Sequence, residues 1–153
     1  MASGVFNIGA TSIGDGAIDF LTGTIKVMLI GTATAYVFEP DNANLGVASG
    51  PSASELSVTG YATGFASADR RTLASKTVAS DLTNNRTTFD AADPAAWTLS
   101  TGGTVAAAVV YHHLTSDALS VPLFYLDFTD VPTNGSTFTL AFAATGIGYL
   151  QNG

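Results

Sequence analysis

The longest uninterrupted apolar run in this chain covers residues 105–111 and is only seven residues long. It contains three valines and a tyrosine, residue types that are enriched in strands. A short apolar run of this kind is typical of a buried strand, and it is far below the roughly 18 residues that suggest a membrane span. The run predicts a central β-strand over residues 105–112.

Several other short segments have the same character. Residues 24–30 and 122–128 are rich in branched and aromatic side chains, and residues 70–80 and 86–90 flank a turn-like segment that predicts a hairpin. In residues 137–143, Phe138, Leu140 and Phe142 alternate with small or polar side chains, as in a half-buried strand. With residues 146–150, these segments predict an all-β, single-domain antiparallel β-sandwich of the jelly-roll or Ig-like type.

Two regions lack a clear strand pattern. Residues 1–16 are rich in Gly, Ser, Ala and Asn, and they predict an extended N-terminal arm without regular structure, followed by a β-sandwich domain over residues 17–153. Ser12 is a suitable N-cap for a short helix that ends at Phe20 or Leu21. Residues 36–64 contain two prolines and four glycines and predict a long loop, with one helical turn at residues 52–56. A loop of this length is often functional.

Composition limits the classes of partner. Charged residues make up 11% of the chain and apolar residues 46%. Folded monomers ordinarily contain about 25% charged residues, so we expect part of the surface to be covered by partners or solvated by Thr, Ser and Asn. The net charge of −7 disfavours direct binding to a nucleic-acid backbone, and the absence of cysteine excludes thiolate ligands. We expect no cofactor, no nucleic-acid partner and no membrane partner.

The two histidines of the chain, His112 and His113, are adjacent. Successive side chains of a strand point to opposite faces, so the two rings are not expected to bind one metal ion. The chain has no third histidine and no cysteine to complete a zinc site. We expect both histidines to be structural or surface residues near a strand end, with Asp117 as a candidate partner for either one.

Catalytic motifs are absent from the sequence. It contains neither the G-x-S-x-G elbow of serine hydrolases nor a phosphate-binding or dinucleotide-binding glycine motif. The acidic pairs Asp90 with Asp93 and Asp127 with Asp130 could act in acid–base catalysis or bind Ca²⁺. Aspartates at strand ends more often accept hydrogen bonds from the backbone. We predict that the protein is not an enzyme and has no catalytic or metal-binding residues.

The candidate partner-binding residues are Val5, Phe6 and Ile8 in the arm, together with Arg70 and Arg71. The three apolar side chains could lie in a groove or add a strand to the sheet edge of a neighbouring molecule. For the two arginines we favour a solvated edge or an ion pair between subunits, with a small anion site as the alternative.

Seven sequence blocks, read in order along the chain, resemble a family of small structural proteins encoded in tailed-phage genomes. They are DFLTGTIKVMLIGT (19–32), VTGYATG (58–64), LASKTV (73–78), FDAADPAAWTL (89–99), AAAVVYHH (106–113), PLFYLDF (122–128) and NGSTFTLAFAATGIGYL (134–150). The chain departs from the family at the Thr-Gly turn of the first block, where an acidic pair is frequent. It also departs at His112 and His113, because members of the family often have acidic residues at this place, directly after the block that corresponds to residues 106–111. None of the blocks is a catalytic motif, so no functional residues are carried over.

The resemblance implies a structural virion protein of a tailed bacteriophage, in particular a capsid decoration or cement protein on the capsid exterior. Such a protein binds the outer surface of the major capsid protein lattice and stabilises the head. The implied partners are the major capsid protein and further copies of the chain, with a homotrimer or another symmetric oligomer as the expected state. On this view, deleting residues 2–12 abolishes shell binding and leaves the domain folded.

A tail or fibre component that binds a host receptor or glycan is the alternative. It requires exposed aromatic side chains, such as Trp97, Tyr36 or Tyr61, beside loop carboxylates. Against this alternative, we expect Trp97 to be a core anchor.

Overall fold

The computed structural model describes residues 3–151 and is mostly β, with antiparallel sheets and one short N-terminal helix. This confirms the predicted class and the antiparallel pairing. In chain order the elements are β1 (Gly4–Val5), α1 (Asn7–Gly14), β2 (Ile25–Gly31), the 3-10 turn η1 (Pro51–Ser54), β3 (Arg71–Thr72), β4 (Thr77–Asp81), β5 (Arg86–Asp90), β6 (Trp97–Thr98), β7 (Thr104–His112), β8 (Val121–Pro132), β9 (Thr137–Phe138) and β10 (Gly148–Gln151).

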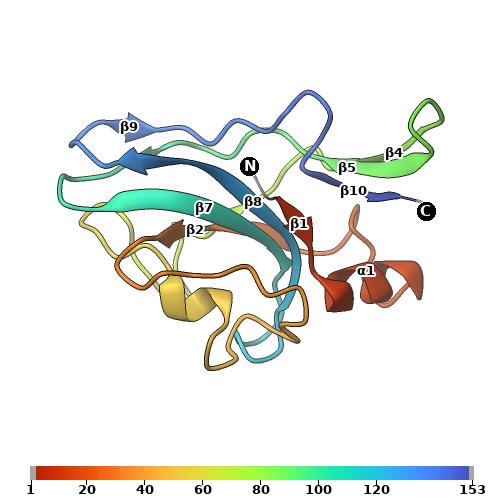
Figure 1. Ribbon diagram of the computed structural model, residues 1–153, viewed down its shortest axis with the longest axis horizontal. Coiled ribbons are helices and arrows are strands. Elements are labelled where there is room, and N and C mark those ends of the chain that lie inside the picture. Colours follow the sequence, from red (N-terminus) through yellow and green to blue (C-terminus); the bar gives the residue numbers. More distant parts are fainter. Residues whose placement is uncertain (1–2, 152–153) are drawn as a thin grey trace.

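The largest sheet has five strands in the order β1-β8-β7-β2-β3. A three-stranded sheet, β10-β5-β4, and a two-stranded pair, β6-β9, complete the strand pairing of the described residues. β9 lies above the large sheet and η1, with its neighbouring loops, lies below it, whereas β4, β5 and β10 extend to one end of the molecule (Figure 1). The large sheet is therefore covered on both faces.

The central strands β2 and β7 are apolar on both faces because each face packs against a separate core. On β2, Ile25, Val27 and Leu29 belong to the main core, and Met28 and Ile30 belong to a second core on the opposite face. The main core also contains Phe89, Trp97 and Phe124, and the second core contains Phe6, Leu45, Tyr111 and Tyr125. The prediction of a buried central strand at residues 105–112 is confirmed.

Two strand boundaries differ from expectation. β8 runs to Pro132, four residues beyond the predicted end at residue 128, because it stays paired with β7 as far as Thr104. Strict alternation of side chains along β7 would place Val105 on the same face as Ala107. A register shift between these two residues instead places Val105 in the main core with Ala108. Residues 139–143 are not a strand, although Leu140 is buried in the main core as the alternation predicted.

The N-terminal region is more ordered than predicted. In the described part of residues 1–16, Gly4 and Val5 pair with Phe124 and Tyr125 of β8, and α1 starts at Asn7 instead of after Ser12. A Cβ on Gly9 would lie 2.6 Å from the carbonyl oxygen of Pro122, so only glycine lets the helix approach β8 this closely. The expectations of an irregular arm and of a helix from Ser12 to Phe20 or Leu21 were wrong. Met1 and Ala2 lie outside the described residues.

Two further expectations are confirmed. Residues 77–90 form the β4–β5 hairpin, whose turn has Asn85 in the left-handed region at φ 52°. The first arm is shorter than the expected residues 70–80, because Arg71 and Thr72 form β3 and pair with β2 in the large sheet. Residues 36–64 are mainly loop, with η1 as the one helical turn expected near residues 52–56. No helix within residues 3–151 has the length and apolar character needed to cross a bilayer.

Candidate functional site

A buried arginine lies where the connection between η1 and β3 meets the loop between β7 and β8. Arg70 is 1% exposed, and its guanidinium donates to both carboxylate oxygens of Glu55 at 2.8 Å. It also donates to both oxygens of Asp117, at 2.5 and 3.0 Å. Two carboxylates therefore clamp one guanidinium, which is the bidentate geometry that makes such pairs strong.

Glu55 connects this cluster to the large sheet. Its Oε1 accepts from the hydroxyl of Tyr61 at 3.1 Å, and the same hydroxyl accepts from the backbone N–H of Leu29 at 3.1 Å. Burial raises the pKa of Tyr61, and the neighbouring Glu55 charge adds to that shift. Burial alone would lower the pKa of Arg70, but its hydrogen bonds to Glu55 and Asp117 outweigh burial and raise it. Arg70 thus stays charged and Tyr61 stays a neutral hydroxyl.

The cluster holds loops together and leaves little of its polar surface for a ligand. Glu55 follows η1, Arg70 precedes β3, and Asp117 belongs to the loop between β7 and β8. The cation of Arg70 also lies 5.8 Å from the ring centroid of Tyr111. The preferred interpretation placed Arg70 at a solvated edge or in an ion pair between subunits. Instead, Arg70 is buried and its ion pairs are with Glu55 and Asp117 of the same chain.

Arg71 differs from its neighbour because its side chain is partly exposed. Its Nη2 lies 3.3 Å from Oδ1 of Asp69, and its guanidinium lies 5.4 Å from the ring centroid of Trp97. The two adjacent arginines therefore diverge, one into the interior and one toward the surface. No site for a single anion forms between them.

The two histidines lie on opposite faces, as strand alternation predicted. The ring of His112 lies beside Gly23, whereas that of His113 stacks on Phe65 with a centroid distance of 4.5 Å. Burial lowers the pKa of both, and nearby Lys76 and Lys26 add to the shift for His112 and His113 respectively. Both Nδ1 atoms are buried without a hydrogen-bond partner among residues 3–151.

Two of the candidate acidic residues accept backbone hydrogen bonds. Asp90 accepts from the N–H of Ala91 at 2.9 Å, and Asp93 accepts from the N–H of Phe142 at 2.7 Å. Within the described part of the chain, no three His, Cys, Asp or Glu residues come together in a way that could hold a metal ion.

The aromatic candidates also separate into buried and accessible residues. Trp97 is 1% exposed and donates its indole N–H to the carbonyl oxygen of Asp69 at 2.8 Å, which confirms it as a core anchor. Tyr61 is buried as well, so neither side chain forms an exposed platform. Tyr36 is half-buried and lies at the surface of the second core.

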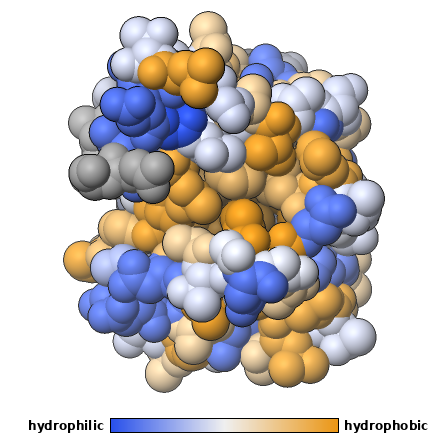
Figure 2. All heavy atoms as spheres, turned by 90° about the vertical axis from the view of Figure 1, so that its right-hand side faces the viewer, coloured by the Kyte–Doolittle hydropathy of each residue, from blue (hydrophilic) through white to orange (hydrophobic). Residues whose placement is uncertain are grey.

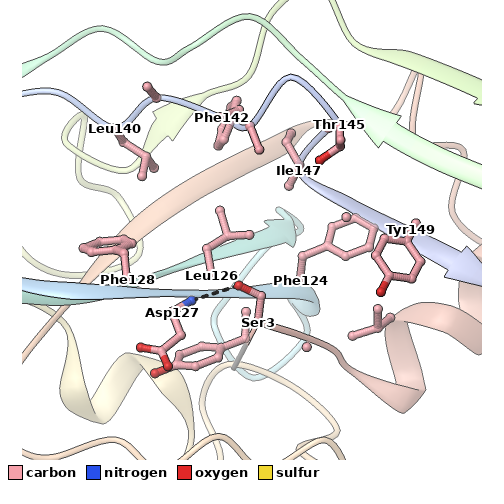
Figure 3. Close-up of a pocket in the computed structure, with 17 residues that line it drawn as sticks. Ser3, Phe124, Leu126, Asp127, Phe128, Leu140, Phe142, Thr145, Ile147 and Tyr149 are labelled. Carbon is pink, nitrogen blue, oxygen red and sulfur yellow. Dashed lines mark hydrogen bonds between the residues drawn. The ribbon is translucent and has the colours of Figure 1, made fainter. Parts of the chain in front are cut away.

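An open apolar hollow lies between β8 and the C-terminal segment. It has a volume of about 590 Å³, and its walls include Leu126 and Phe128 of β8 and Leu140, Phe142 and Ile147 opposite them. These side chains point toward one another across the opening (Figure 3). On the end of the molecule that carries α1, β1 and β10, apolar atoms surround a central depression (Figure 2).

A second hollow lies on the opposite face of β8. It has a volume of about 580 Å³ and is lined by Tyr36, Phe38, Tyr125, Asp127 and Asp130 among others. The rings of Phe38 and Tyr125 are stacked at 5.0 Å, and burial raises the pKa of Tyr36 and of Tyr125. We call this the aromatic hollow. Tyr125 and Asp127 line both hollows, so β8 separates them.

The N-terminal partner-binding candidates contact this chain's own core. Phe6 is 0% exposed and lies edge-on to Phe38 at 5.0 Å in the second core. Val5 packs on the main core and Ile8 on the second core, both partly exposed. Phe6 is therefore not available to a partner while the chain is folded in this way. Val5 also lines the apolar hollow.

Comparisons of the chain with protein-family models, with curated proteins and with solved structures give no match.

Sequence reasoning missed both the Arg70 cluster and the two hollows. Glu55, Arg70 and Asp117 are separated by 15 and 47 residues, and no local pattern links them. Only the composition indicated that such a cluster could form. The chain has five basic and twelve acidic residues, so each arginine has several acidic residues as candidate partners.

Proposed function

We propose that this chain is a structural virion protein of a tailed phage, a capsid decoration or cement protein that is not an enzyme. In this role it binds the outer surface of the major capsid protein lattice as a homo-oligomer, with a trimer as the expected state, and stabilises the head. The observation that carries the proposal is the open apolar hollow beside β8 on a chain with few charges.

The physical basis is binding energy shared over many copies. Burial of apolar surface contributes roughly 25 cal/mol per Å², and the cost of association offsets much of this at a single contact. In a lattice, each added copy bridges subunits that already touch, so modest contacts raise the temperature at which the shell opens. The exposed apolar side chains Val37, Leu82 and Leu119 add candidate contact surface.

The arrangement of polar groups supports a binding role over a catalytic one. Catalytic triads hold their histidine through hydrogen bonds to a nucleophile and to an orienting acid. In the described chain, Asp117 is engaged by Arg70 and the Nδ1 atoms of His112 and His113 are buried without partners. We also propose that the layers covering the large sheet make the fold a β-sandwich of the jelly-roll or Ig-like type.

The direct test adds the purified chain to shells that lack it. The expected result is saturation at one copy or one oligomer per lattice repeat and a higher temperature of shell disruption. Ala141→Trp, which fills the apolar hollow, should reduce occupancy, and Ala79→Trp, on the exposed face of β4, should not. If the chain binds only at the tail, or does not bind the shells at all, the decoration role would be rejected.

A tail or fibre component that binds a glycan is the second candidate, and the aromatic hollow favours it. Tyr36 beside Asp127 and Asp130 supplies the apolar face and carboxylates that sugar recognition uses. Imaging of intact particles separates the two roles by copy number and position, and a glycan array tests the sugar directly.

A further inference from the structure

The tip of the β4–β5 hairpin presents an apolar side chain to solvent. Leu82 is 85% exposed, although the turn that carries it is held by side-chain hydrogen bonds. The carboxylate of Asp81 accepts from the backbone N–H of Asn84 at 3.2 Å and from its side-chain amide at 2.8 Å. It also accepts from Nε of Arg86 at 2.8 Å. The turn is therefore ordered before any contact, which lowers the entropy lost when Leu82 binds a partner.

The hairpin also projects from the body of the molecule. β4 and β5 lead away from the large sheet to one end (Figure 1), and the side chains of residues 77–80 are all exposed. On the neighbouring strand β10, the ring centroid of Tyr149 lies 4.5 Å from the guanidinium of Arg86 and supports the hairpin from that side. A neighbouring molecule can therefore reach the tip without displacing any part of the fold.

The apolar hollow beside β8 has the size and the walls to accept such a side chain. Its volume of about 590 Å³ exceeds that of one leucine side chain. Leu126 and Phe128 on one wall face Leu140 and Phe142 on the other (Figure 3). A leucine placed between them would contact both walls and leave water. Leu82 of the same copy does not fill the hollow, because it remains exposed.

Charge favours a second copy as the source of the leucine. Each copy carries a net charge of −7, so two copies repel least where carboxylates are absent or paired. The turn residues 82–85 are uncharged, and Asp81 is paired with Arg86. The only charged residue that lines the hollow in the described chain is Asp127, whose carboxylate points away from Leu126, to the opposite side of β8 (Figure 3). The tip and the hollow can therefore meet without bringing carboxylates of two copies together.

We propose that Leu82 of one copy inserts into the apolar hollow of a second copy and joins the copies into a closed oligomer. The contact joins two different patches of the chain, so it closes a ring when it is repeated around a rotation axis. A cyclic trimer is the expected ring. This inference rests on the homo-oligomer of the proposed function and names the contact that forms it. Filling the hollow then weakens shell binding by separating the copies.

The absence of cysteine allows a direct test of the contact. The single-cysteine variants Leu82→Cys and Ala141→Cys, the latter at the exposed rim of the hollow, are mixed and oxidised. A disulfide requires the two Cα atoms to come within about 7 Å, so the yield of linked pairs in mass spectrometry reports proximity. The control pairs Leu82→Cys with Leu119→Cys, an exposed position in the loop between β7 and β8. We expect the Ala141 pair to exceed this control at least about fivefold.

Sedimentation velocity of the free chain tests whether the same contact holds the oligomer together. At about 100 µM the wild type should sediment as an oligomer, which corresponds to a dissociation constant below that concentration. Leu82→Asp should raise the dissociation constant about tenfold or more, because a charge would have to enter apolar walls. Leu119→Asp, the same charge change at another exposed leucine, should leave it unchanged.

A second variant acts on the other side of the contact. Ala141→Trp fills the hollow and should also give monomers. Because Leu82 is exposed, Leu82→Asp keeps the test decisive even if Ala141→Trp fails to fold.

Three results would overturn the proposal. They are a monomeric wild type at about 100 µM, an oligomer that Leu82→Asp leaves intact, and equal disulfide yields for the Ala141 and Leu119 pairs. Shell binding by an oligomer that does not depend on Leu82 would reject this inference alone. An oligomer that depends on Leu82 but does not bind shells would reject the virion role alone.

Discussion

Glu55 and Arg70 form a two-point ion pair inside the protein, with both N···O distances at 2.8 Å and the arginine side chain fully buried. Asp117 forms a second ion pair with the same guanidinium, and its carboxylate remains partly exposed. Because a buried charge is costly without its partners, this cluster requires the loops at residues 55, 70 and 117 to fold over the sheet together.

The first prediction concerns this cluster. Arg70→Met should lower the free energy of unfolding by about 3–5 kcal/mol, because Glu55 would keep a buried charge without its cation. Arg71→Met removes a partly exposed arginine and should cost about 1 kcal/mol or less. Urea denaturation of both variants measures the difference. Equal stability of the two variants would show that Arg70 is not buried with its acids in solution.

The second prediction concerns pH. Burial lowers the pKa of His112 and His113 in the folded chain, so below the ordinary histidine pKa of about 6.5 the unfolded chain binds more protons. Stability should therefore fall as pH decreases from about 6.5 toward 5. The double variant His112→Gln/His113→Gln should flatten this dependence. A slope in wild type that the double variant keeps would assign it to other groups.

The third prediction concerns the contact between α1 and β8. Gly9→Ala should destabilise the fold by about 1–3 kcal/mol, since overpacking against Pro122 outweighs the better helix propensity of alanine. At Gly14, a Cβ would meet nothing within 4 Å. Gly14→Ala should therefore be neutral or stabilising by up to about 1 kcal/mol. Thermal unfolding of the two variants should give shifts of opposite sign or clearly different size.

The fourth prediction replaces the expectation that residues 2–12 can be removed without unfolding. Phe6→Ala should cost about 3–5 kcal/mol because Phe6 is buried in the second core. The exposed Val37 is a control, and Val37→Ala should change stability by about 0.5 kcal/mol or less. If Phe6→Ala is as stable as Val37→Ala, the N-terminal residues are a separable arm after all.

Much of the fold was predictable because the evidence for strands lies in consecutive residues. The apolar run at residues 105–111 became β7, and the turn before Arg86 became the β4–β5 hairpin. The helix was misplaced because its start depends on Phe6. That side chain lies in the second core, and its carbonyl accepts the first helical bond from Ala10. Ser12 offered a better local cap, but packing of α1 on β8 decided the register.

By itself, the sequence determined the antiparallel β class, the buried central strands, the opposed directions of His112 and His113 and the burial of Trp97. These follow from side-chain period and apolar character, which neighbouring residues set. Only the tertiary structure decided that Glu55, Arg70 and Asp117 meet, and that two hollows lie on opposite faces of β8. Both depend on how loops distant in sequence cross the sheet, and no local pattern encodes such crossings.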